Sequence, residues 1–417
     1  MSEFRALSVA AAQAVVWGEL ARLPAEEVGI TAALGRVLAA DVLANRDLPP
    51  APVSAMDGYA VRSADVAVAG ARLPVVGVIH AGQVAPRALQ AGECMRIMTG
   101  APLPAGADAV IRVEESQRDG EAAVFSVSVA AGRDVRPRGE SMREGQLMLP
   151  AGYTLNPGAV GILATVKAAR VPVHRLPRVA ILSTGDELEA LDAPLDLQRI
   201  PDSNAYALMA QVQALGIQPV LLGIAPDEPA ALASALAEGL DPARFDVLLV
   251  SGGSSMGEHD YVQPALASLG VKLHFHRVEM RPGHPVMFGT LEGRCVFGLP
   301  GNPVSSMVCF EQLVLPALRR LMGQAQCFRR TLTARLREPV RTRAGRTEFI
   351  RVQLARDADG SWSAWPTGAQ GSAILLSMAQ ADGLLIVPAA CNGLAAGALA
   401  EVQVFESMNY QAAGVSV

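Results

Sequence analysis

The sequence predicts an α/β protein of several domains, centred on a doubly wound and mainly parallel sheet. Its 417 residues are too many for a single hydrophobic core. Apolar residues make up 51% of the chain and charged residues 18%, a composition typical of packed globular domains. Between residues 178 and 322, strand-like and helix-like segments alternate, as in "RVAILSTGDEL" followed by "AYALMAQVQALG". Such alternation is typical of βαβ units, whose strands run parallel.

The other segments predict further modules around this α/β module, which we place at residues 175–327. Residues 1–45 are rich in alanine and predict helices, and residues 139–174 return to a helical pattern after Pro157, so the two segments together form an N-terminal module. A proline-rich break begins near residue 46, and the short alternating apolar runs after it predict a small antiparallel β domain inserted at 46–138. Residues 328–417 again alternate like strands and predict a C-terminal β domain.

Charge and cysteine content exclude several classes of protein. Lys and Arg number 35 against 40 Asp and Glu, and the net charge of −5 gives no broad attraction to nucleic acid or to an anionic membrane. The five cysteines are widely spaced and form no CxxC pair, so neither a disulfide framework nor a zinc–cysteine site is expected. No apolar run reaches the ~18 residues that a membrane span needs. We therefore expect a cytoplasmic location.

Polar, turn-forming residues follow each predicted strand of the α/β module. They are "STGDE" at 183–187, "PDE" at 226–228, "SGGSSMGEHD" at 251–260 and "LPGNP" at 299–303. Ligands of open α/β sheets bind beyond the carboxyl ends of the strands, so we expect these segments to meet at one ligand-binding edge. The binding residues expected there are Ser183, Thr184, Gly185, Asp186, Ser251, Gly252, Gly253, Ser254, Pro300, Gly301 and Asn302.

Two of these segments are suited to bind an anion such as phosphate. Gly252 and Gly253 carry no Cβ, so their backbone N–H groups can approach a ligand closely. Asn302 before Pro303 predicts an N-cap and a first-turn proline, and the N-terminus of that helix would direct free N–H groups to the same ligand. The segment "SGGSSMG" lacks the Gly-Lys-Ser/Thr ending of a Walker A loop, so any nucleotide is bound in another way.

The same edge carries several carboxylates, namely Asp186, Glu187, Asp227, Glu258 and Asp260. They would repel a phosphate unless a cation lay between, and clustered oxygen ligands are what Mg²⁺ uses when it shares its coordination with substrate phosphates. The alternative is that the Gly-Gly pair forms a tight turn and that the acids are solvated loop residues. The combination of four strand ends favours a magnesium and phosphate site over that alternative.

A second group of basic residues suggests an oxyanion pocket. They lie in "HRVEMRPGHP" and "RTRAGRTEFIR" and comprise Arg277, Arg281, His284, Arg341, Arg343, Arg346 and Arg351. Several guanidinium groups around one Pro-Gly turn fit oxyanion recognition, although lone arginines are commonly solvated. His274 and His276 share one face of a predicted strand and are an alternative metal site, but no cysteine or third histidine lies near them in the sequence.

Taken in order, the motifs resemble those of one family. They are "SAMDGYAV", "RIMTGAPLPAGADAVI", "STGDEL", "DSN", "SGGSSMGEHDYV", "RPGHPVMFG", "GLPGNPVSSMV" and "GSAILLSMAQADGLLIVP". This series resembles the molybdopterin molybdenumtransferase family, which includes the MoeA proteins and the E domain of gephyrin. The likeness extends over nearly the whole chain, so it is more specific than any single motif.

The resemblance implies an enzyme of molybdenum cofactor biosynthesis. Such an enzyme takes adenylylated molybdopterin and molybdate, inserts molybdenum at the dithiolene and releases AMP in a reaction that depends on Mg²⁺. It also implies an α/β domain of the molybdopterin-binding type, a C-terminal domain like a β-barrel and an elongated homodimer joined through a linking N-terminal module. The active site would lie between the α/β domain of one subunit and parts of the other. Further implied partners are the preceding adenylyltransferase and proteins of molybdoenzyme maturation.

The resemblance assigns residues by motif position. Ser305, Arg346 and Ser372 fall where the family handles molybdate or the pterin phosphate, and Glu187, Asp227 and Asp260 carry over as metal ligands. We expect catalytic roles for Asp57, Glu187, Asp227, Asp260, Arg281 and Arg346. Besides the strand-end residues, we expect cofactor-binding roles for Thr99, Arg277, His284, Ser305, Arg351 and Ser372.

Some positions depart from the family's pattern. An expected aspartate is Ser141, and the family's lysines around the Pro-Gly turn are Arg277, Arg281 and His284. Arginine keeps the positive charge of lysine but is bulkier and less compact. Three functions therefore stay open at this point. They are an active molybdenumtransferase, a paralogue with another oxyanion such as tungstate or with lost turnover, and a binding or scaffold protein like gephyrin; the retained acids and Gly-Gly pair favour the enzyme.

Overall fold

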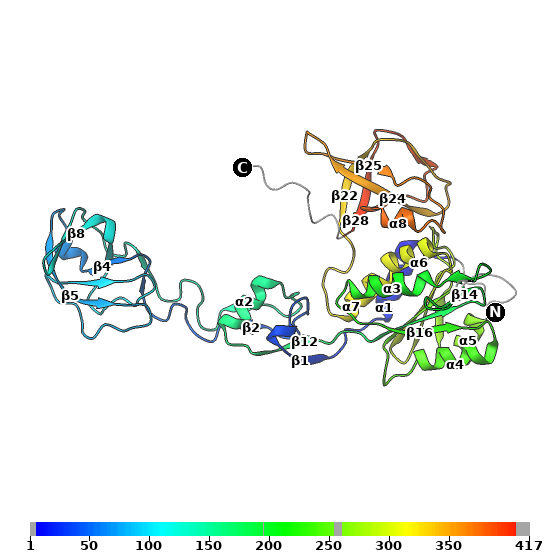
Figure 1. The fold of residues 1–417 in the computed structure, drawn as a ribbon, viewed down its shortest axis with the longest axis horizontal. Coiled ribbons are helices and arrows are strands. Elements are labelled where there is room, and N and C mark those ends of the chain that lie inside the picture. The colour runs from blue at the N-terminus through cyan, green and yellow to red at the C-terminus, as the bar shows by residue number, and fades with distance from the viewer. Residues whose placement is uncertain (1–5, 195, 254–260, 406–417) are drawn as a thin grey trace.

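The computed structural model describes residues 6–194, 196–253 and 261–405, and the molecule is elongated (Figure 1). A small β module lies at one end and a connecting module with helix α2 (Pro157–Thr165) lies in the middle. The α/β module and a C-terminal β module lie next to each other at the other end. Separate clusters of buried apolar side chains fill the small β, connecting, α/β and C-terminal modules, so the chain folds around several cores.

The α/β module contains a twisted six-stranded sheet in its described residues. Its strands, in spatial order, are β16 (Val220–Ala225), β13 (Val179–Thr184), β17 (Val247–Ser251), β21 (Arg294–Leu299), β20 (Met287–Leu291) and β18 (Lys272–Phe275). The first four run parallel, and β20 and β18 run antiparallel to their neighbours. This arrangement confirms the predicted, mainly parallel sheet.

Helices cover both faces of this sheet, as in a doubly wound fold. One face packs against α1 (Val9–Glu19), α3 (Ser203–Gln213), α6 (Pro303–Cys309) and α7 (Leu315–Leu321), with a π-helical segment at Phe310–Val314 between the last two. The other face packs against α4 (Pro229–Gly239) and α5 (Val262–Ser268). No helix within the described ranges is both long and apolar enough to cross a membrane.

The connecting module corrects one prediction. Residues 1–45 were expected to be helical, but after α1 they contain the strand β1 (Ala25–Gly29), a short 3-10 helix at Ile30–Ala32 and the strand β2 (Val42–Leu43). Gly35 has a φ of 76°, which ends any helix there, and the buried Leu38 forms a β-bridge with Val173. Tertiary pairing thus overrides the helical propensity of this alanine-rich segment. The other strands of the module are β11 (Leu147–Leu149) and β12 (Arg170–His174).

The inserted β module has one feature that the sequence did not predict. Its sheet runs in the order β7 (Ala109–Arg112), β4 (Gly58–Val61), β6 (Cys94–Ile97), β5 (Arg72–Ile79), β9 (Ala122–Phe125) and β8 (Ser116–Asp119). The expected antiparallel pairing is wrong for β5 and β6, which run parallel. Parallel strands need a long connection that returns the chain to the end of the sheet where the first strand began. The segment between Ile79 and Cys94 is long enough for this, whereas a hairpin turn is not. A short pair, β3 (Val53–Ser54) and β10 (Val135–Arg136), completes the module.

The C-terminal module is a closed barrel. Around it run β24 (Thr347–Arg356), β25 (Trp362–Pro366), β22 (Thr331–Leu336), β28 (Leu399–Val404) and β26 (Gly383–Val387), and the last strand pairs with the first. Smaller elements are β23 (Val340–Arg341), β27 (Gly393–Leu394) and α8 (Leu376–Ala379). The α/β module contributes β19 (Met280–Arg281), which pairs with β24 in parallel. This pairing places the Pro-Gly turn of the α/β module against the barrel.

Candidate active site

The four predicted strand-end segments meet at one edge of the α/β sheet. Strands β16, β13, β17 and β21 are neighbours in that order and parallel, so their carboxyl ends, Ala225, Thr184, Ser251 and Leu299, lie side by side. The expectation of a common edge is confirmed for the described residues. Two buried hydroxyl oxygens at this edge, Ser183 Oγ and Thr184 Oγ1, have no hydrogen-bond partner among those residues. They are polar groups that a ligand can satisfy.

The glycine pair has a packing role that the sequence did not reveal. Gly252 and Gly253 have φ values of 94° and 60°, a region that favours glycine. A Cβ on Gly252 would collide with the carbonyl oxygen of Thr184, and one on Gly253 would collide with Val262. The chain's own packing therefore requires both glycines, whatever the loop binds. Gly301 lies beside them, because a Cβ there would come within 3.9 Å of the Gly252 Cα.

Asn204, the asparagine of the "DSN" motif, also lies at this edge, although the motif alone predicts no role for it. It is buried in the first turn of α3, and its Nδ2 donates hydrogen bonds of 2.8 Å to Ser251 Oγ and to the Gly301 carbonyl oxygen. Asp202 caps the same helix by accepting from the Ala205 N–H. The cap can be predicted from the sequence. The hydrogen bond to Gly301 cannot, because its two residues lie 97 positions apart. Asn204 thus joins the loops that follow β17 and β21.

The acids after β13 and β16 also lie close together. The carboxylate of Glu187 folds back over Gly185, where a Cβ would collide with it. Asp186 Oδ1 accepts a 3.1 Å hydrogen bond from the Asp227 backbone N–H, which joins the two loops. Two of the expected metal ligands, Glu187 and Asp227, therefore lie on neighbouring loops. Asp260 and Ser254 lie outside the described residues, and within the described ranges no three His, Cys, Asp or Glu side chains form a metal-binding group.

The N-terminus of α6 partly matches its prediction. Asn302 occupies the N-cap position and Pro303 begins the helix, as expected, but the Asn302 side chain makes no capping hydrogen bond. Pro300 before it is buried, whereas Gly301 and Asn302 are exposed at the sheet edge. The backbone of this turn is therefore accessible next to Gly252.

Six of the predicted basic and hydroxyl residues line one cavity of about 290 Å³ between the α/β module and the barrel. They are Arg281, His284, Ser305, Arg346, Arg351 and Ser372. The Pro-Gly turn, α6, strand β24 and the segment around residue 372 supply them. Gly283 lets the turn approach α6, since a Cβ there would collide with Cys309 Sγ. Arg277 is half-buried before this turn and is not among the lining residues.

Arg351 is the most unusual charge in the cavity. It is 1% exposed, and its guanidinium donates to neutral acceptors, Ser377 Oγ at 3.2 Å and the carbonyl oxygens of Phe349 and Gly371 at 3.4 Å. Burial lowers the pKa of the guanidinium to about 10, so the side chain is still charged at neutral pH. No carboxylate pairs with it among the described residues. A buried cation of this kind lacks a counter-ion.

Two other lining residues are held in place by the fold. Arg281 Nη1 donates a 3.1 Å hydrogen bond to the buried carboxylate of Glu348, which also accepts from the Arg343 backbone N–H. His284 Nδ1 lies 2.7 Å from the Val278 carbonyl oxygen and therefore donates to it, which leaves Nε2 as the second polar atom of the ring. Glu348 was not predicted, because its partner lies 67 positions away in another module.

Asp57 and Thr99 lie together but far from the other predicted residues. Asp57 Oδ1 accepts hydrogen bonds from Thr99 N at 2.8 Å and Thr99 Oγ1 at 2.7 Å. These two bonds hold the pKa of the Asp57 carboxyl below its usual range. Both residues belong to the small β module, at the opposite end of the elongated chain from the α/β sheet (Figure 1). One chain therefore does not bring them to the strand-end site.

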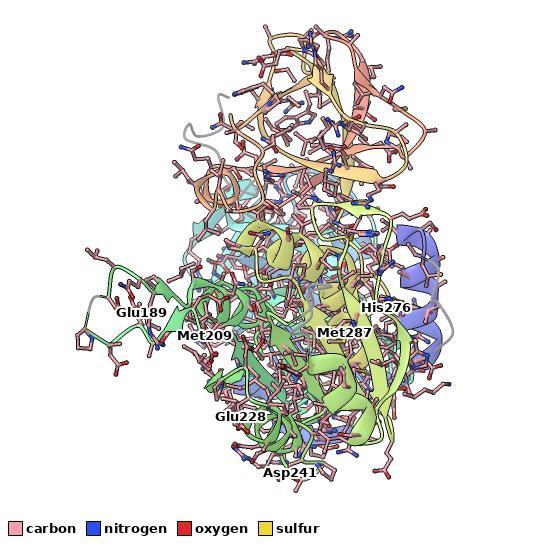
Figure 2. The ribbon with its side chains drawn as sticks, turned by 90° about the vertical axis from the view of Figure 1, so that its right-hand side faces the viewer. Glu189, Met209, Glu228, Asp241, His276 and Met287 are labelled. Atoms are coloured by element: carbon pink, nitrogen blue, oxygen red, sulfur yellow. The ribbon has the colours of Figure 1, made fainter. Side chains whose placement is uncertain are left out.

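The alternative histidine site is not supported by the described residues. His274 Nε2 lies 2.8 Å from Thr290 Oγ1, and its ring stacks on Phe288. His274 belongs to β18, at the edge of the sheet opposite β16, and Figure 2 shows His276 near α1 on the side of the module opposite Glu189. The His274 ring is accounted for by packing within the fold.

Family models match the chain in three consecutive parts. The MoeA N-terminal region (domain I and II) matches residues 7–166, a probable molybdopterin-binding domain matches 180–320, and the MoeA C-terminal region (domain IV) matches 333–405. A molybdopterin molybdenumtransferase of Nostoc sp. is 38% identical over 372 residues, which cover 87% of this chain and 85% of the relative. The chain belongs to the molybdopterin molybdenumtransferase family. Membership makes it an enzyme of molybdenum cofactor biosynthesis and confirms the resemblance drawn from the motifs.

Other members of the molybdenumtransferase family agree over the full length. The Synechococcus elongatus enzyme is 36% identical over 407 residues, covering 95% of this chain and 99% of the relative. The crystal structure of the MoeA protein from Pyrococcus horikoshii has a TM-score of 0.83 at 31% identity, covering 96% of this chain and all of that one. The predicted multidomain fold class is thus confirmed.

The departures from the molybdenumtransferase pattern fall in different places. Arg281 and His284 line the cavity and contribute to its polar surface. Ser141 lies where the small β module meets the connecting module, and its Oγ accepts a 3.2 Å hydrogen bond from Arg136. It is thus remote from the α/β module of its own chain.

Proposed function

We propose that this enzyme inserts molybdenum from molybdate into adenylylated molybdopterin and releases AMP in a reaction that depends on Mg²⁺. The observation that carries the proposal is Arg351, a charged and buried guanidinium without a carboxylate partner, in a cavity next to the α6 turn. Molybdate is a dianion with tetrahedral oxygens, so it supplies the missing negative charge and several acceptors at once.

The cavity residues have complementary tasks in this proposal. Arg351 and Arg346 provide charge, the hydroxyl groups of Ser305 and Ser372 donate to oxyanion oxygens, and His284 presents Nε2. Glu348 neutralises part of the charge of Arg281 and holds its guanidinium at the cavity wall. The cavity therefore positions the oxyanion without binding it as tightly as three unpaired guanidinium groups would.

The strand-end site binds the organic substrate in this proposal. The turns at Gly252 and Gly301 offer backbone N–H groups to the phosphates, and the buried hydroxyls of Ser183 and Thr184 gain partners. Asn204 keeps the two turns in register. The phosphates are thereby fixed beside the oxyanion cavity, which brings the two substrates together.

The acids of this edge suit a magnesium ion by their donor chemistry. Glu187 and Asp227 lie on adjacent loops and supply the hard carboxylate oxygens that Mg²⁺ prefers, and the family resemblance adds Asp260. When bound, the ion would offset phosphate charge and assist departure of AMP.

Asp57 and Thr99 point to a homodimer. Because they lie in the small β module of an elongated chain, they reach a strand-end site only if it belongs to a second copy. The active site would then combine the α/β module of one copy with the small β module of its partner. Protein partners would be the preceding adenylyltransferase and proteins of molybdoenzyme maturation in the cytoplasm.

The test is AMP release from adenylylated molybdopterin by the full chain. We expect release to require both molybdate and Mg²⁺, with tungstate as a second arm because Arg281 and His284 replace lysines at the cavity. Preference for tungstate would support the paralogue with another oxyanion. Absence of release with either oxyanion, in folded protein that still binds the pterin, would overturn the proposed reaction and leave a binding role.

A further inference from the structure

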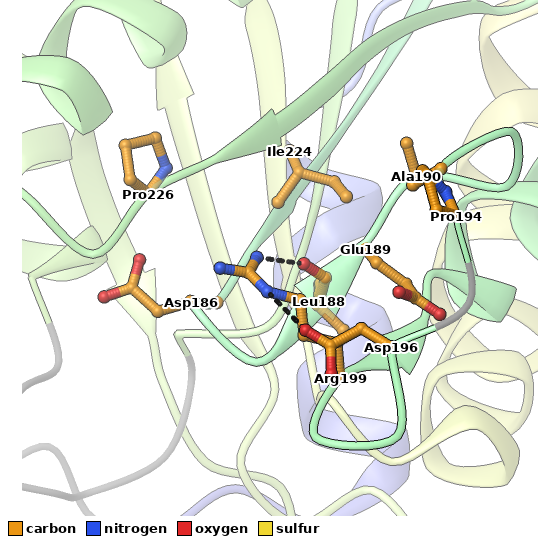
Figure 3. Close-up of a pocket in the computed structure, with 11 residues that line it drawn as sticks. Asp186, Leu188, Glu189, Ala190, Pro194, Asp196, Arg199, Ile224 and Pro226 are labelled. Atoms are coloured by element: carbon orange, nitrogen blue, oxygen red, sulfur yellow. Dashed lines mark hydrogen bonds and ion pairs between the residues drawn. The ribbon is translucent and has the colours of Figure 1, made fainter.

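A second cavity, of about 480 Å³, lies at the outer end of the same sheet edge (Figure 3). Its described lining lies within residues 185–194, which include β14 (Leu188–Glu189), and 196–199, which precede β15 (Ile200–Pro201), together with the end of β16 and Pro226. Its polar lining comprises Asp186, Glu189, Asp196 and Arg199, and Ile224 and Pro226 supply apolar surface. The cavity is large enough for a bicyclic heterocycle, and only Asp186 and Gly185 of its lining belong to the predicted site.

Glu189 is a buried acid without a partner. The residue is 7% exposed, and its Oε2 atom is buried with no hydrogen-bond partner among the described residues. Burying a carboxylate oxygen without a donor is costly, and within the described part of the chain Glu189 has backbone hydrogen bonds alone, such as the one from the Asp202 N–H to its carbonyl oxygen. The carboxylate therefore lacks a hydrogen-bond donor, which a ligand in the cavity can supply.

Arg199 gives the cavity a donor next to this acceptor. Its Nη1 donates to the Leu188 carbonyl oxygen at 3.1 Å, and its Nε lies 3.9 Å from Asp196 Oδ2. These contacts orient the guanidinium, whose Nη2 makes no bond to a described residue. Figure 3 shows the guanidinium between Asp186 and Glu189. The wall thus presents a carboxylate acceptor and a fixed guanidinium donor.

We propose that this cavity binds the pyrimidinone edge of the pterin, with Glu189 as its specificity-determining residue. That edge carries two neighbouring donors, the 2-amino group and N3–H, followed by the O4 acceptor. A carboxylate accepts two parallel hydrogen bonds, and the guanidinium of Arg199 donates to O4. Adenine does not match, because its edge alternates donor and acceptor. The inference rests on the proposed function, which supplies the pterin.

The test measures the binding of free pterin to the full chain through the fluorescence anisotropy of the pterin. We expect Glu189→Gln to weaken pterin binding at least about tenfold, because the amide cannot accept both hydrogens. Asp192→Asn is the matched control, since Asp192 is an exposed acid on the same loop, and it should leave binding unchanged. Lumazine, in which an oxygen replaces the 2-amino group, should bind the wild type at least about tenfold more weakly than pterin.

Competition with GMP and AMP shows whether the cavity recognises a pterin or a purine base. Guanine carries the same donors and acceptor as pterin. A higher affinity of the cavity for GMP than for pterin would therefore contradict a pterin site. AMP should not displace pterin at all. Equal affinities of the wild type and Glu189→Gln, equal binding of lumazine and pterin, or no saturable pterin binding by the wild type would each overturn the inference.

The inference and the proposed reaction fail separately. If the wild type releases AMP with molybdate but Glu189→Gln binds pterin normally, only the role of Glu189 is refuted. If Glu189→Gln loses pterin binding while the wild type releases no AMP, the cavity assignment stands and the reaction is refuted. Circular dichroism of Glu189→Gln checks its fold, and the lumazine comparison in the wild type does not depend on any variant.

Discussion

The side-chain amide of Asn204 donates a 2.8 Å hydrogen bond to the carbonyl oxygen of Gly301. The same amide nitrogen donates to Ser251 Oγ, so one buried side chain on α3 fixes the turns after two neighbouring strands. Both turns lie where the proposed reaction places the substrate phosphates. Their relative position therefore depends on a residue that belongs to neither turn.

Asn204→Asp should raise KM for adenylylated molybdopterin at least about tenfold, because a carboxylate facing the Gly301 carbonyl oxygen removes the donor and adds repulsion. Gln213→Glu on the same helix is the charge-matched control, since Gln213 is exposed and remote from both turns. Steady-state kinetics of AMP release measure the effect. An unchanged KM in a folded Asn204→Asp protein would show that the two turns do not need this bond.

Arg351→Met should weaken molybdate binding at least about tenfold while changing thermal stability little, because it removes an uncompensated buried charge. Arg356→Lys, at the exposed end of the same strand, should leave both unchanged. A molybdate titration of AMP release and a thermal melt of each protein make the comparison. Loss of stability without loss of molybdate affinity would mean that Arg351 serves only the fold.

The lowered pKa of Arg351 also predicts a pH dependence. The protonated guanidinium binds the oxyanion, so binding through this side chain is complete well below its pKa of about 10 and is lost as pH rises through that value. We expect molybdate affinity in the wild type to decline between pH 9 and about 11. Arg351→Met should show no such decline, and a decline of the same size in both proteins would exclude Arg351 as its origin.

Asp246 stabilises the α/β module at neutral pH. Burial alone raises the pKa of its carboxyl, but hydrogen bonds from Arg175 at 2.6 and 2.7 Å and from Arg178 outweigh burial and hold the pKa well below its usual range. A depressed carboxyl pKa contributes stability above the ordinary value of about 4, and this contribution is lost as pH falls below it. The ion pairs therefore stabilise the module at pH 7 and not in strong acid.

Asp246→Asn should lower the free energy of unfolding of this module by about 2–4 kcal/mol at pH 7 and by less at pH 3. Glu238→Gln is the control, because Glu238 pairs with Arg244 at 2.8 Å but is half exposed. Urea unfolding at both pH values measures the difference. A loss from Asp246→Asn that stays the same at pH 3 would contradict the assigned role of the charge.

Local patterns predicted much of the fold and the site. The apolar runs ending at Thr184, Ser251 and Leu299 are parallel neighbours, and basic residues from two distant segments, such as Arg281 and Arg351, do line one cavity. The helical prediction for the part of residues 1–45 that follows α1 was wrong because Leu38 pairs with Val173, far along the chain. The partners of Asn204 and Glu348 and the unpaired, buried carboxylate of Glu189 were also missed, since they depend on distant segments or on a cavity. Sequence periodicity carries no information on such contacts.

We propose that molybdenum insertion occurs at a site shared by two copies of the chain. Asp57→Asn and Glu187→Gln should each lower AMP release by about two orders of magnitude, because each removes a charged oxygen from that site. In a heterodimer of the two variants, the intact Asp57 and the intact Glu187 meet at one of the two sites. Random exchange of subunits in an equal mixture should therefore restore roughly a quarter of wild-type activity.

The decisive measurement is molybdate-dependent AMP release by the mixture of Asp57→Asn and Glu187→Gln proteins after subunit exchange. The shared site predicts recovery to roughly a quarter of the wild-type rate, with each variant alone almost inactive. The side chains of Asp57 and Glu187 are both exposed, so both variants should fold. A mixture no more active than its separate components, after exchange has been verified, would contradict the account.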